Sequence, residues 1–160
     1  MPRSVLDTTP LCIPDDVIKM RQSVDGGHVE FYDPLRDKWV SATPEERVRQ
    51  AFVAYMINNL TYWPSRMVNE YSLKLNGTLR RVDTVVFDDY MRPVMLVEYK
   101  APDVGVTRRT FDQVVRYNMV LQARYLVVFN GLHIYGCEVD TDSGAYRFLE
   151  HIPTYKEIKG

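Results

Sequence analysis

The sequence predicts a single α/β domain built on a mixed central β-sheet flanked by helices. Helix-like and strand-like segments follow one another in the order helix, three strands, helix, two strands. No internal repeat, low-complexity segment or linker separates them. The length of 160 residues, with 46% hydrophobic and 26% charged residues, is typical of one globular domain and excludes a disordered or fibrous chain.

Residues 1–27 are expected to form an N-terminal arm, and residues 28–160 a single domain. The arm shows no sustained periodicity and ends at the turn signal Asp25-Gly26-Gly27. We therefore expect it to pack on the body or to be partly mobile, and to carry no function. After it, apolar residues alternate on both sides of residues 33–37, which predicts a short hairpin or two edge strands.

The first helix is predicted to begin after Thr43. Thr43 suits the N-cap, Pro44 the first helical position, and Glu46 the third position of a capping box. Apolar residues then recur at helical spacing and predict a helix of roughly 16 residues ending near residues 58–59. These residues are Val48, Phe52, Tyr55, Met56 and Leu60.

The remaining elements follow from turn signals between apolar segments. Asn76-Gly77 predicts a tight hairpin, and a second helix is expected from near Thr107 or Thr110 to about Ala123. Residues 125–129 form a continuous apolar run, typical of a strand buried on both faces. The predicted strands are 67–75, 79–87, 93–99, 125–129, 132–139 and 145–149, with a short tail at 155–158.

Three charged residues interrupt two strands that otherwise look buried. Asp83 lies in one strand, and Glu98 and Lys100 lie two positions apart, hence on one face, in the next. Hairpin pairing can place Asp83 opposite them. The two carboxylates, with the carbonyl of Tyr99, would then offer Mg²⁺ or Mn²⁺ a partial coordination shell, and Lys100 could orient or deprotonate an attacking water. The alternative is a structural salt bridge between Lys100 and one of the carboxylates.

Gln113 and Tyr117 lie one turn apart on the second helix, so they share a face. We expect Gln113 to look towards the end of the sheet that carries Glu98 and Lys100. Alternatively, Gln113 closes a capping box with Thr110, and Tyr117 is an ordinary core tyrosine.

The first helix can supply a further carboxylate from Glu45 or Glu46. Since Glu46 is the natural capping partner of Thr43, Glu45 is the freer of the two. The alternative is that both acids only stabilise the helix N-terminus.

Together these motifs resemble the PD-(D/E)xK nuclease superfamily, and within it the domain at the N-terminus of type I restriction enzyme R subunits. The resemblance spans roughly residues 28–138. Its motifs are the helix opening Pro44-Glu45-Glu46-Arg47-Val48-Arg49-Gln50, Arg81-x-Asp83, Glu98-x-Lys100-Ala-Pro and Gln113-x-x-x-Tyr117. Val82 stands where the motif's proline is expected.

The resemblance implies a restriction-endonuclease-like core and a Mg²⁺- or Mn²⁺-dependent endonuclease that hydrolyses phosphodiester bonds in DNA. Asp83 and Glu98 would bind the metal, Lys100 would be catalytic, and the helix-one Glu would assist the metal shell. Gln113 with Tyr117 would form an accessory motif that contacts DNA or supports the site. The alternative is a catalytically silent DNA- or protein-binding subunit of a restriction or repair complex.

The expected partners are DNA and a separate motor or specificity subunit. The sequence contains no G-x-x-x-x-G-K-[ST] motif, so this chain is not expected to translocate DNA alone. DNA or RNA as substrate, activity of the chain alone, and the oligomeric state are left open.

Charge distribution is consistent with a local nucleic-acid contact. The net charge of −1 excludes a basic field over the whole molecule. Residues 47–124, however, hold 12 Lys and Arg against 7 Asp and Glu. The arginines that could approach a phosphate backbone are Arg80, Arg81, Arg92, Arg108, Arg109, Arg116 and Arg124, although surface arginines are often merely solvated.

Other chemistry is not indicated. The chain has two cysteines, Cys12 and Cys137, which are too few for a disulfide framework. No apolar run approaches ~18 residues. We therefore expect a cytoplasmic protein without membrane contact. The three histidines lack metal-ligand spacing, and no serine lies in a G-x-S-x-G context.

Overall fold

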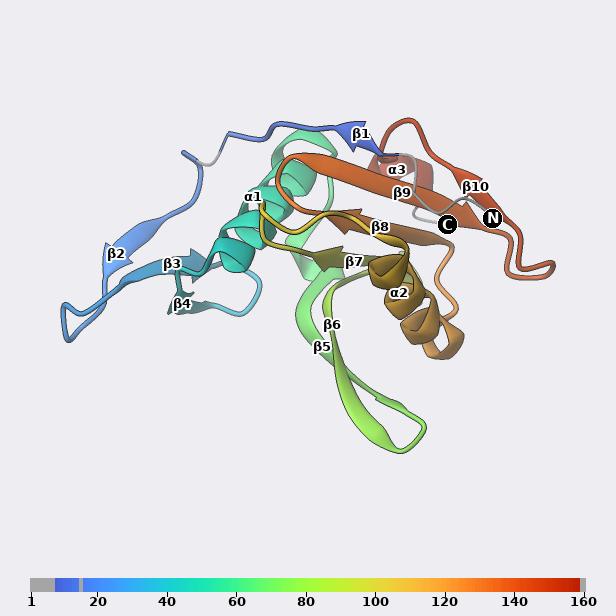
Figure 1. Ribbon diagram of the computed structural model, residues 1–160, viewed down its shortest axis with the longest axis horizontal. Helices are drawn as coiled ribbons and strands as arrows, with labels where there is room; N and C mark the ends of the chain where they lie inside the picture. The colour runs from blue at the N-terminus through green and yellow to red at the C-terminus, as the bar shows by residue number, and fades with distance from the viewer. Residues whose placement is uncertain (1–7, 15, 159–160) are drawn as a thin grey trace.

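The computed structural model describes residues 8–14 and 16–158, which form two sheets and three α-helices among the described residues (Figure 1). In chain order the elements are β1 (Thr9–Pro10), β2 (Met20–Gln22), β3 (Val29–Asp33), β4 (Lys38–Ser41), α1 (Pro44–Asn59), the 3₁₀ turn η1 (Pro64–Arg66), β5 (Met67–Leu75), β6 (Thr78–Phe87), β7 (Pro93–Tyr99), α2 (Arg108–Leu121), β8 (Tyr125–Phe129), β9 (His133–Val139), β10 (Tyr146–Phe148) and α3 (Tyr155–Ile158).

The larger sheet is mixed, as the sequence predicts. Its strands lie in the order β1-β9-β8-β7-β6-β5, and β10 pairs with β9. Only β7 and β8 run parallel among the described pairs. A parallel pair needs a crossover connection, and α2 supplies it. The predicted α/β class with a mixed central sheet flanked by helices is therefore confirmed.

Helices cover both faces of this sheet. Along β8, Val127 belongs to the hydrophobic cluster that contains Phe52 of α1, whereas Leu126 and Val128 belong to the cluster that contains Phe111 of α2. Successive strand residues point to opposite faces, so this alternation places α1 on one side and α2 on the other. The apolar run at 125–129 is thus a strand buried on both faces.

The first helix has the predicted bounds, Pro44–Asn59. The Thr43 hydroxyl accepts a hydrogen bond from the Glu46 amide over 3.0 Å. The Glu46 carboxylate does not complete the capping box, because it accepts hydrogen bonds from Arg36 and Gln50 instead. The predicted N-cap at Thr43 is therefore confirmed, and the prediction that Glu46 completes a capping box is wrong.

The second helix begins after Thr107, whose hydroxyl accepts from the Thr110 amide over 3.4 Å. Thr110 is therefore inside the helix, and the capping box between Thr110 and Gln113 does not form. The helix ends at Leu121, before Gln122, which has a left-handed backbone with φ 56°.

The hairpin of β5 and β6 extends away from the central sheet (Figure 1). Asn76 and Gly77 have φ values of 52° and 77°, both positive, as a two-residue hairpin turn with matching twist requires. Residues 78–81 of β6, which lie between the turn and Val82, are exposed. The hairpin predicted from Asn76-Gly77 is confirmed.

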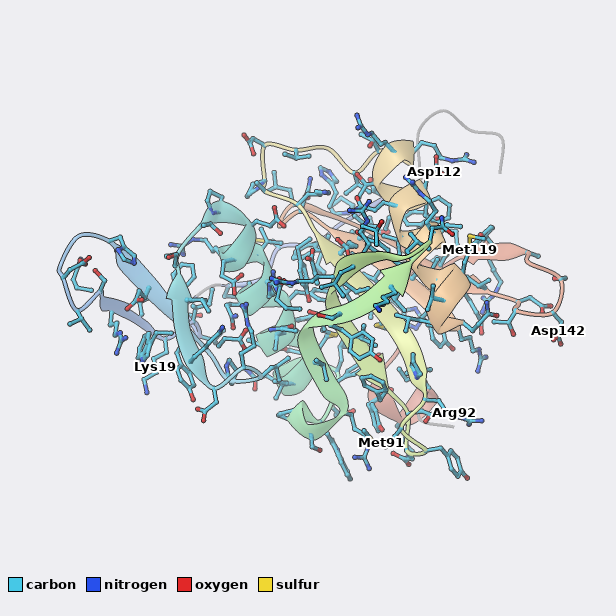
Figure 2. All side chains as sticks on the ribbon, turned by 90° about the horizontal axis from the view of Figure 1, so that it is seen from below. Lys19, Met91, Arg92, Asp112, Met119 and Asp142 are labelled. Carbon is cyan, nitrogen blue, oxygen red and sulfur yellow. The ribbon has the colours of Figure 1, made fainter. Side chains whose placement is uncertain are left out.

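Part of the N-terminal arm pairs with the body. β1 adds to the large sheet through Thr9 opposite Ile134, and β2 joins β3 through Met20 opposite Phe31. The predicted hairpin after residue 28 is the pair β3 and β4, which with β2 forms a three-stranded sheet beyond α1 (Figures 1 and 2). Residues 1–7 and 15 of the arm lie outside the described residues.

Within residues 8–14 and 16–158, no helix is both long and apolar enough to cross a membrane.

Candidate active site

Asp83 and Glu98 meet where β6 and β7 diverge. Regular pairing of the two strands ends at Thr84 opposite Val97. Beyond it, the Asp83 amide donates to Glu98 Oε1 over 3.3 Å, and the Tyr99 amide donates to Asp83 Oδ2 over 2.9 Å. Side-chain carboxylates thus take the place of main-chain acceptors, which brings the two acids together at the open end of the strand pair.

Two negative charges at this position interact strongly. Glu98 is buried, with 4% of its surface exposed. Burial raises the pKa of the Glu98 carboxyl well above its usual value, and the neighbouring Asp83 charge raises it further. Asp83 itself is half-buried. A carboxyl whose pKa is strongly raised by burial and by a neighbouring charge is typical of functional sites.

Lys100 supplies a positive charge beside the two acids. It follows the last residue of β7, and its main-chain amide donates to the Phe129 carbonyl over 3.0 Å. Its ammonium opposes the rise in pKa at both Glu98 and Glu45. Among the described residues, Lys100 forms no ion pair within 4.0 Å, so the structural salt bridge considered for it is not formed.

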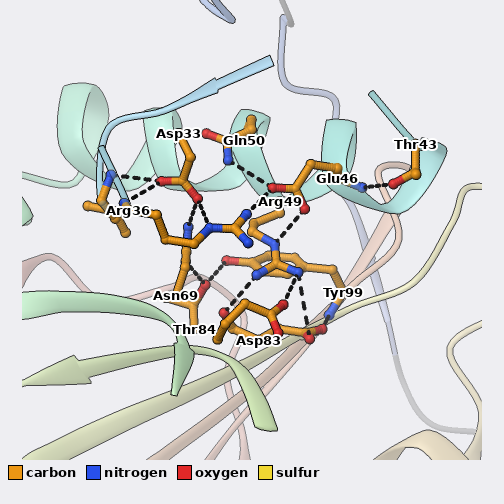
Figure 3. A network of polar contacts seen from close by, with 12 residues as sticks. Asp33, Arg36, Thr43, Glu46, Arg49, Gln50, Asn69, Asp83, Thr84 and Tyr99 are labelled. Atoms are coloured by element: carbon orange, nitrogen blue, oxygen red, sulfur yellow. Dashed lines mark hydrogen bonds and ion pairs between the residues drawn. The ribbon is translucent and has the colours of Figure 1, made fainter. Parts of the chain in front are cut away.

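Glu45 is the acid of α1 that faces this charge cluster. Burial raises the pKa of Glu45, and the Asp83 charge raises it further. Glu45 also lines a cavity of about 350 Å³ together with Arg49 and Ala101. Glu46 lines the same cavity, but its carboxylate binds Arg36, Arg49 and Gln50 (Figure 3).

Arg49 ties α1 to the strand that carries Asp83. Its guanidinium is 2.6 Å from Glu70 Oε1, donates to the Asp83 carbonyl over 3.2 Å, and lies 3.9 Å from Asp83 Oδ1 (Figure 3). Its Nε lies 3.1 Å from Glu46 Oε2. Only 5% of Arg49 is exposed. The role of Arg49 is not predicted from the sequence, although a charged residue next to Val48 on a helix that packs on the sheet is a signal that points to it.

A second chain of hydrogen bonds supports Tyr99 from the α1 side. The Asp33 carboxylate accepts from Asn69 over 2.8 Å, the Asn69 amide oxygen accepts from Thr84 over 2.6 Å, and the Thr84 hydroxyl is 2.9 Å from the Tyr99 hydroxyl (Figure 3). Burial alone would raise the pKa of Asp33, but hydrogen bonds from Asn69 and Arg36 outweigh it and lower the pKa. Tyr99, whose amide holds Asp83, is therefore anchored at both its side chain and its main chain.

Gln113 and Tyr117 form a pair away from the carboxylates. Gln113 Nε2 donates to the Tyr117 hydroxyl over 2.8 Å, and both line a cavity of about 300 Å³ against the β5–β6 hairpin. Among the described residues, no hydrogen bond or ion pair joins either one to Asp83, Glu98 or Lys100. Tyr117 also packs in the α2-side core with only 6% exposed.

The donor set at Asp83 and Glu98 suits a hard divalent cation. No group of three or more His, Cys, Asp and Glu with metal-binding geometry occurs among the described residues. Two carboxylates alone leave most of an octahedral shell to other oxygens, which is how Mg²⁺ usually binds, with several waters retained. The carbonyl of Tyr99 is the further protein ligand expected from the sequence.

A family model described as the type I restriction enzyme R protein N terminus (HSDR_N) matches residues 44–153. The chain belongs to this family. The HSDR_N match begins at the first residue of α1 and includes every residue predicted for the site. It leaves out the three-stranded sheet β2–β4, which is thus additional to the matched region.

One similar solved structure is a fragment assigned as the HsdR subunit of a type I restriction enzyme from Vibrio vulnificus YJ016. It shares 22% sequence identity with this HSDR_N chain at a TM-score of 0.45. The match covers 67% of this chain and 22% of that one. No curated protein sequence matches the chain.

Proposed function

We propose that this HSDR_N domain is a metal-dependent nuclease module of a restriction system that hydrolyses phosphodiester bonds in DNA. The observation that carries the proposal is the meeting of Asp83 and Glu98 from neighbouring strands, with the charges of Lys100 and Glu45 acting on them. Membership of the family of type I restriction enzyme R protein N termini supports DNA as the substrate.

In this proposal, Asp83 and Glu98 hold Mg²⁺ or Mn²⁺, with the carbonyl of Tyr99 as a third ligand. The bound cation would lower the pKa of a water and neutralise charge on the phosphate. Lys100 orients or deprotonates the attacking water from its place directly after Tyr99. Glu45 adds a carboxylate that assists the metal shell from the first turn of α1.

Movement along DNA and choice of sequence would come from a separate motor or specificity subunit. The sequence contains no G-x-x-x-x-G-K-[ST] motif with which to bind ATP phosphates.

A second candidate is a catalytically silent DNA- or protein-binding subunit. One observation favours it: Asp83 and Glu98 each already accept a main-chain N–H. The two acids could then serve only to finish the strand pair in place of carbonyl oxygens.

Nicking of supercoiled plasmid by the purified chain distinguishes the two candidates. We expect nicking with Mg²⁺ or Mn²⁺, none with EDTA, and a rate lower by roughly 10²–10⁴-fold for Lys100→Ala. Lys156→Ala on α3, an exposed lysine, is the matched control and should nick like the wild type. A wild-type chain that binds DNA but never nicks it with either metal would favour the silent subunit.

A further inference from the structure

A cavity of about 300 Å³ separates the β5–β6 hairpin from α2. The residues that line it from the hairpin are Leu75, Asn76, Thr78 and Arg80, and those from the helix are Gln113, Arg116 and Tyr117. In Figures 1 and 2 the hairpin reaches past the central sheet alongside α2. Nearly all of this lining can donate hydrogen bonds, so the cavity is suited to a ligand rich in acceptor oxygens.

Arg80 and Arg116 bring uncompensated positive charge to the cavity. Both side chains belong to exposed residues, and neither forms an ion pair with a carboxylate in the described part of the chain. Hairpin residues 71–82 contain three Lys and Arg and no Asp or Glu. The nearest acid on α2, Asp112, is held by Arg108 at 3.0 Å. An anion between the two arginines would therefore meet no competing carboxylate.

The Tyr117 hydroxyl adds a donor at the cavity wall. Because it accepts a hydrogen bond from Gln113, its own proton is left for another acceptor. Tyr117 is otherwise buried in the α2-side core, so this donor is fixed in position. Two guanidinium groups and a fixed hydroxyl are typical of a site for phosphate oxygens.

We infer that this cavity binds a phosphate of the DNA backbone, as a second site distinct from the phosphate that reacts at Asp83 and Glu98. Arg80 lies three residues before Asp83 on β6, which is about 10 Å along a strand, so the two phosphate sites are separate. The inference rests on the proposed function for DNA as the ligand.

Salt-dependent DNA binding tests the inference without cleavage. The full chain is titrated into a fluorescently labelled 20-base-pair duplex in EDTA, at salt concentrations from 50 to 200 mM. For Arg80→Ala/Arg116→Ala we expect binding roughly tenfold weaker, with the slope of log K against log salt smaller by about 0.9, for the one phosphate contact that is lost. Arg80→Lys/Arg116→Lys keeps both charges and should retain the slope. Tyr117→Phe should weaken binding with no change in slope.

The control is Arg21→Ala/Arg147→Ala, which removes the same charge. Arg21 binds Glu30 and Arg147 binds Glu138, both away from the hairpin. We expect the control to keep the wild-type slope. Equal slopes for the two double variants, or a wild-type chain that does not bind the duplex, would overturn the site.

A free phosphate could satisfy the same donors, so inorganic phosphate and a nucleoside monophosphate are added at millimolar concentration in thermal melts. The assignment to DNA would be overturned if these small ligands raise the melting temperature only when Arg80 and Arg116 are present, while the salt slope of DNA binding is the same for the wild type and Arg80→Ala/Arg116→Ala. Plasmid nicking is scored separately. If the double variant changes the salt slope but the wild type never nicks plasmid, the phosphate site stands and the nuclease proposal is overturned. If the wild type nicks plasmid but the double variant has the wild-type slope, only the phosphate site is overturned.

Discussion

The main-chain amide of Asp83 donates a hydrogen bond to the Glu98 carboxylate over 3.3 Å, at the point where their strands separate. The Asp83 carboxylate accepts in turn from the amide of Tyr99, the residue after Glu98. A regular antiparallel pair would satisfy these amides with carbonyl oxygens. Because the two carboxylates replace carbonyl oxygens as acceptors, both acidic side chains are fixed in position. The same hydrogen bonds hold the two negative charges together against their repulsion.

Glu98→Gln should show that repulsion as a pH dependence in the absence of metal. The pKa of folded Glu98 is raised well above its usual 4.5 by burial and by Asp83, so the folded chain keeps the proton to higher pH than the unfolded chain. The stability from this proton is complete below about pH 4.5 and is lost as pH rises through the folded pKa. The free energy of unfolding of the variant should therefore gain on that of the wild type as pH rises.

Urea unfolding in EDTA across a pH series measures this difference. Glu150→Gln, at an exposed position, should follow the wild type at every pH. A difference between Glu98→Gln and the wild type that stays constant with pH would show that the two carboxyls do not interact as described.

Arg49→Met should destabilise the fold strongly, because it leaves Glu46, Glu70 and Asp83 facing one another without their shared cation. Removing one partner from a buried charge cluster costs about 3–5 kcal/mol. Arg81→Ala is the control, since its side chain is 65% exposed and 3.8 Å from Glu70, and it should change stability by less than about 0.5 kcal/mol. Equal losses in urea unfolding would remove Arg49 as the link between α1 and β6.

Glu45→Gln and Glu46→Gln should affect different properties, although the residues are neighbours: the first should affect nicking and the second stability. Glu46→Gln weakens contacts to Arg36 and Arg49 and should lower the free energy of unfolding by about 1.5–3 kcal/mol. Glu45→Gln should leave stability nearly unchanged and slow metal-dependent nicking of plasmid. Unfolding and nicking assays on both variants settle the choice, and slower nicking in a stable Glu46→Gln protein would reverse it.

Much of the fold is predictable because its signals are local. Thr43 with Pro44 sets the start of α1, and Asn76-Gly77 sets the β5–β6 turn. The start of α2 is ambiguous from sequence, because Thr107 and Thr110 both suit an N-cap. The pairing of β1 with β9 joins residues 9 and 134, and no local signal could reveal it.

The site residues likewise fall into those that local signals predict and those whose position depends on tertiary packing. Strand alternation suffices to place Asp83 near Glu98, because both lie on adjacent strands of one meander. The contacts of Arg49 depend on how α1 docks on the sheet, and the position of Gln113 depends on how α2 lies against the hairpin. Both are tertiary relationships, which explains why Arg49 was missed and why Gln113 was expected at the carboxylates.

Thermal melts with and without millimolar Mg²⁺ or Mn²⁺ test most directly whether Asp83 and Glu98 form a metal site. The wild-type midpoint should rise with metal, since binding at 100 times Kd adds about 2.7 kcal/mol to folded-state stability. Asp83→Asn keeps an oxygen for the Tyr99 amide and removes a repelling charge, so without metal it should melt at or above the wild type, and metal should not shift it. The exposed control Asp103→Asn should respond like the wild type. A wild-type midpoint indifferent to both metals, together with a destabilised Asp83→Asn, would contradict the metal site and leave the two acids as a structural pair.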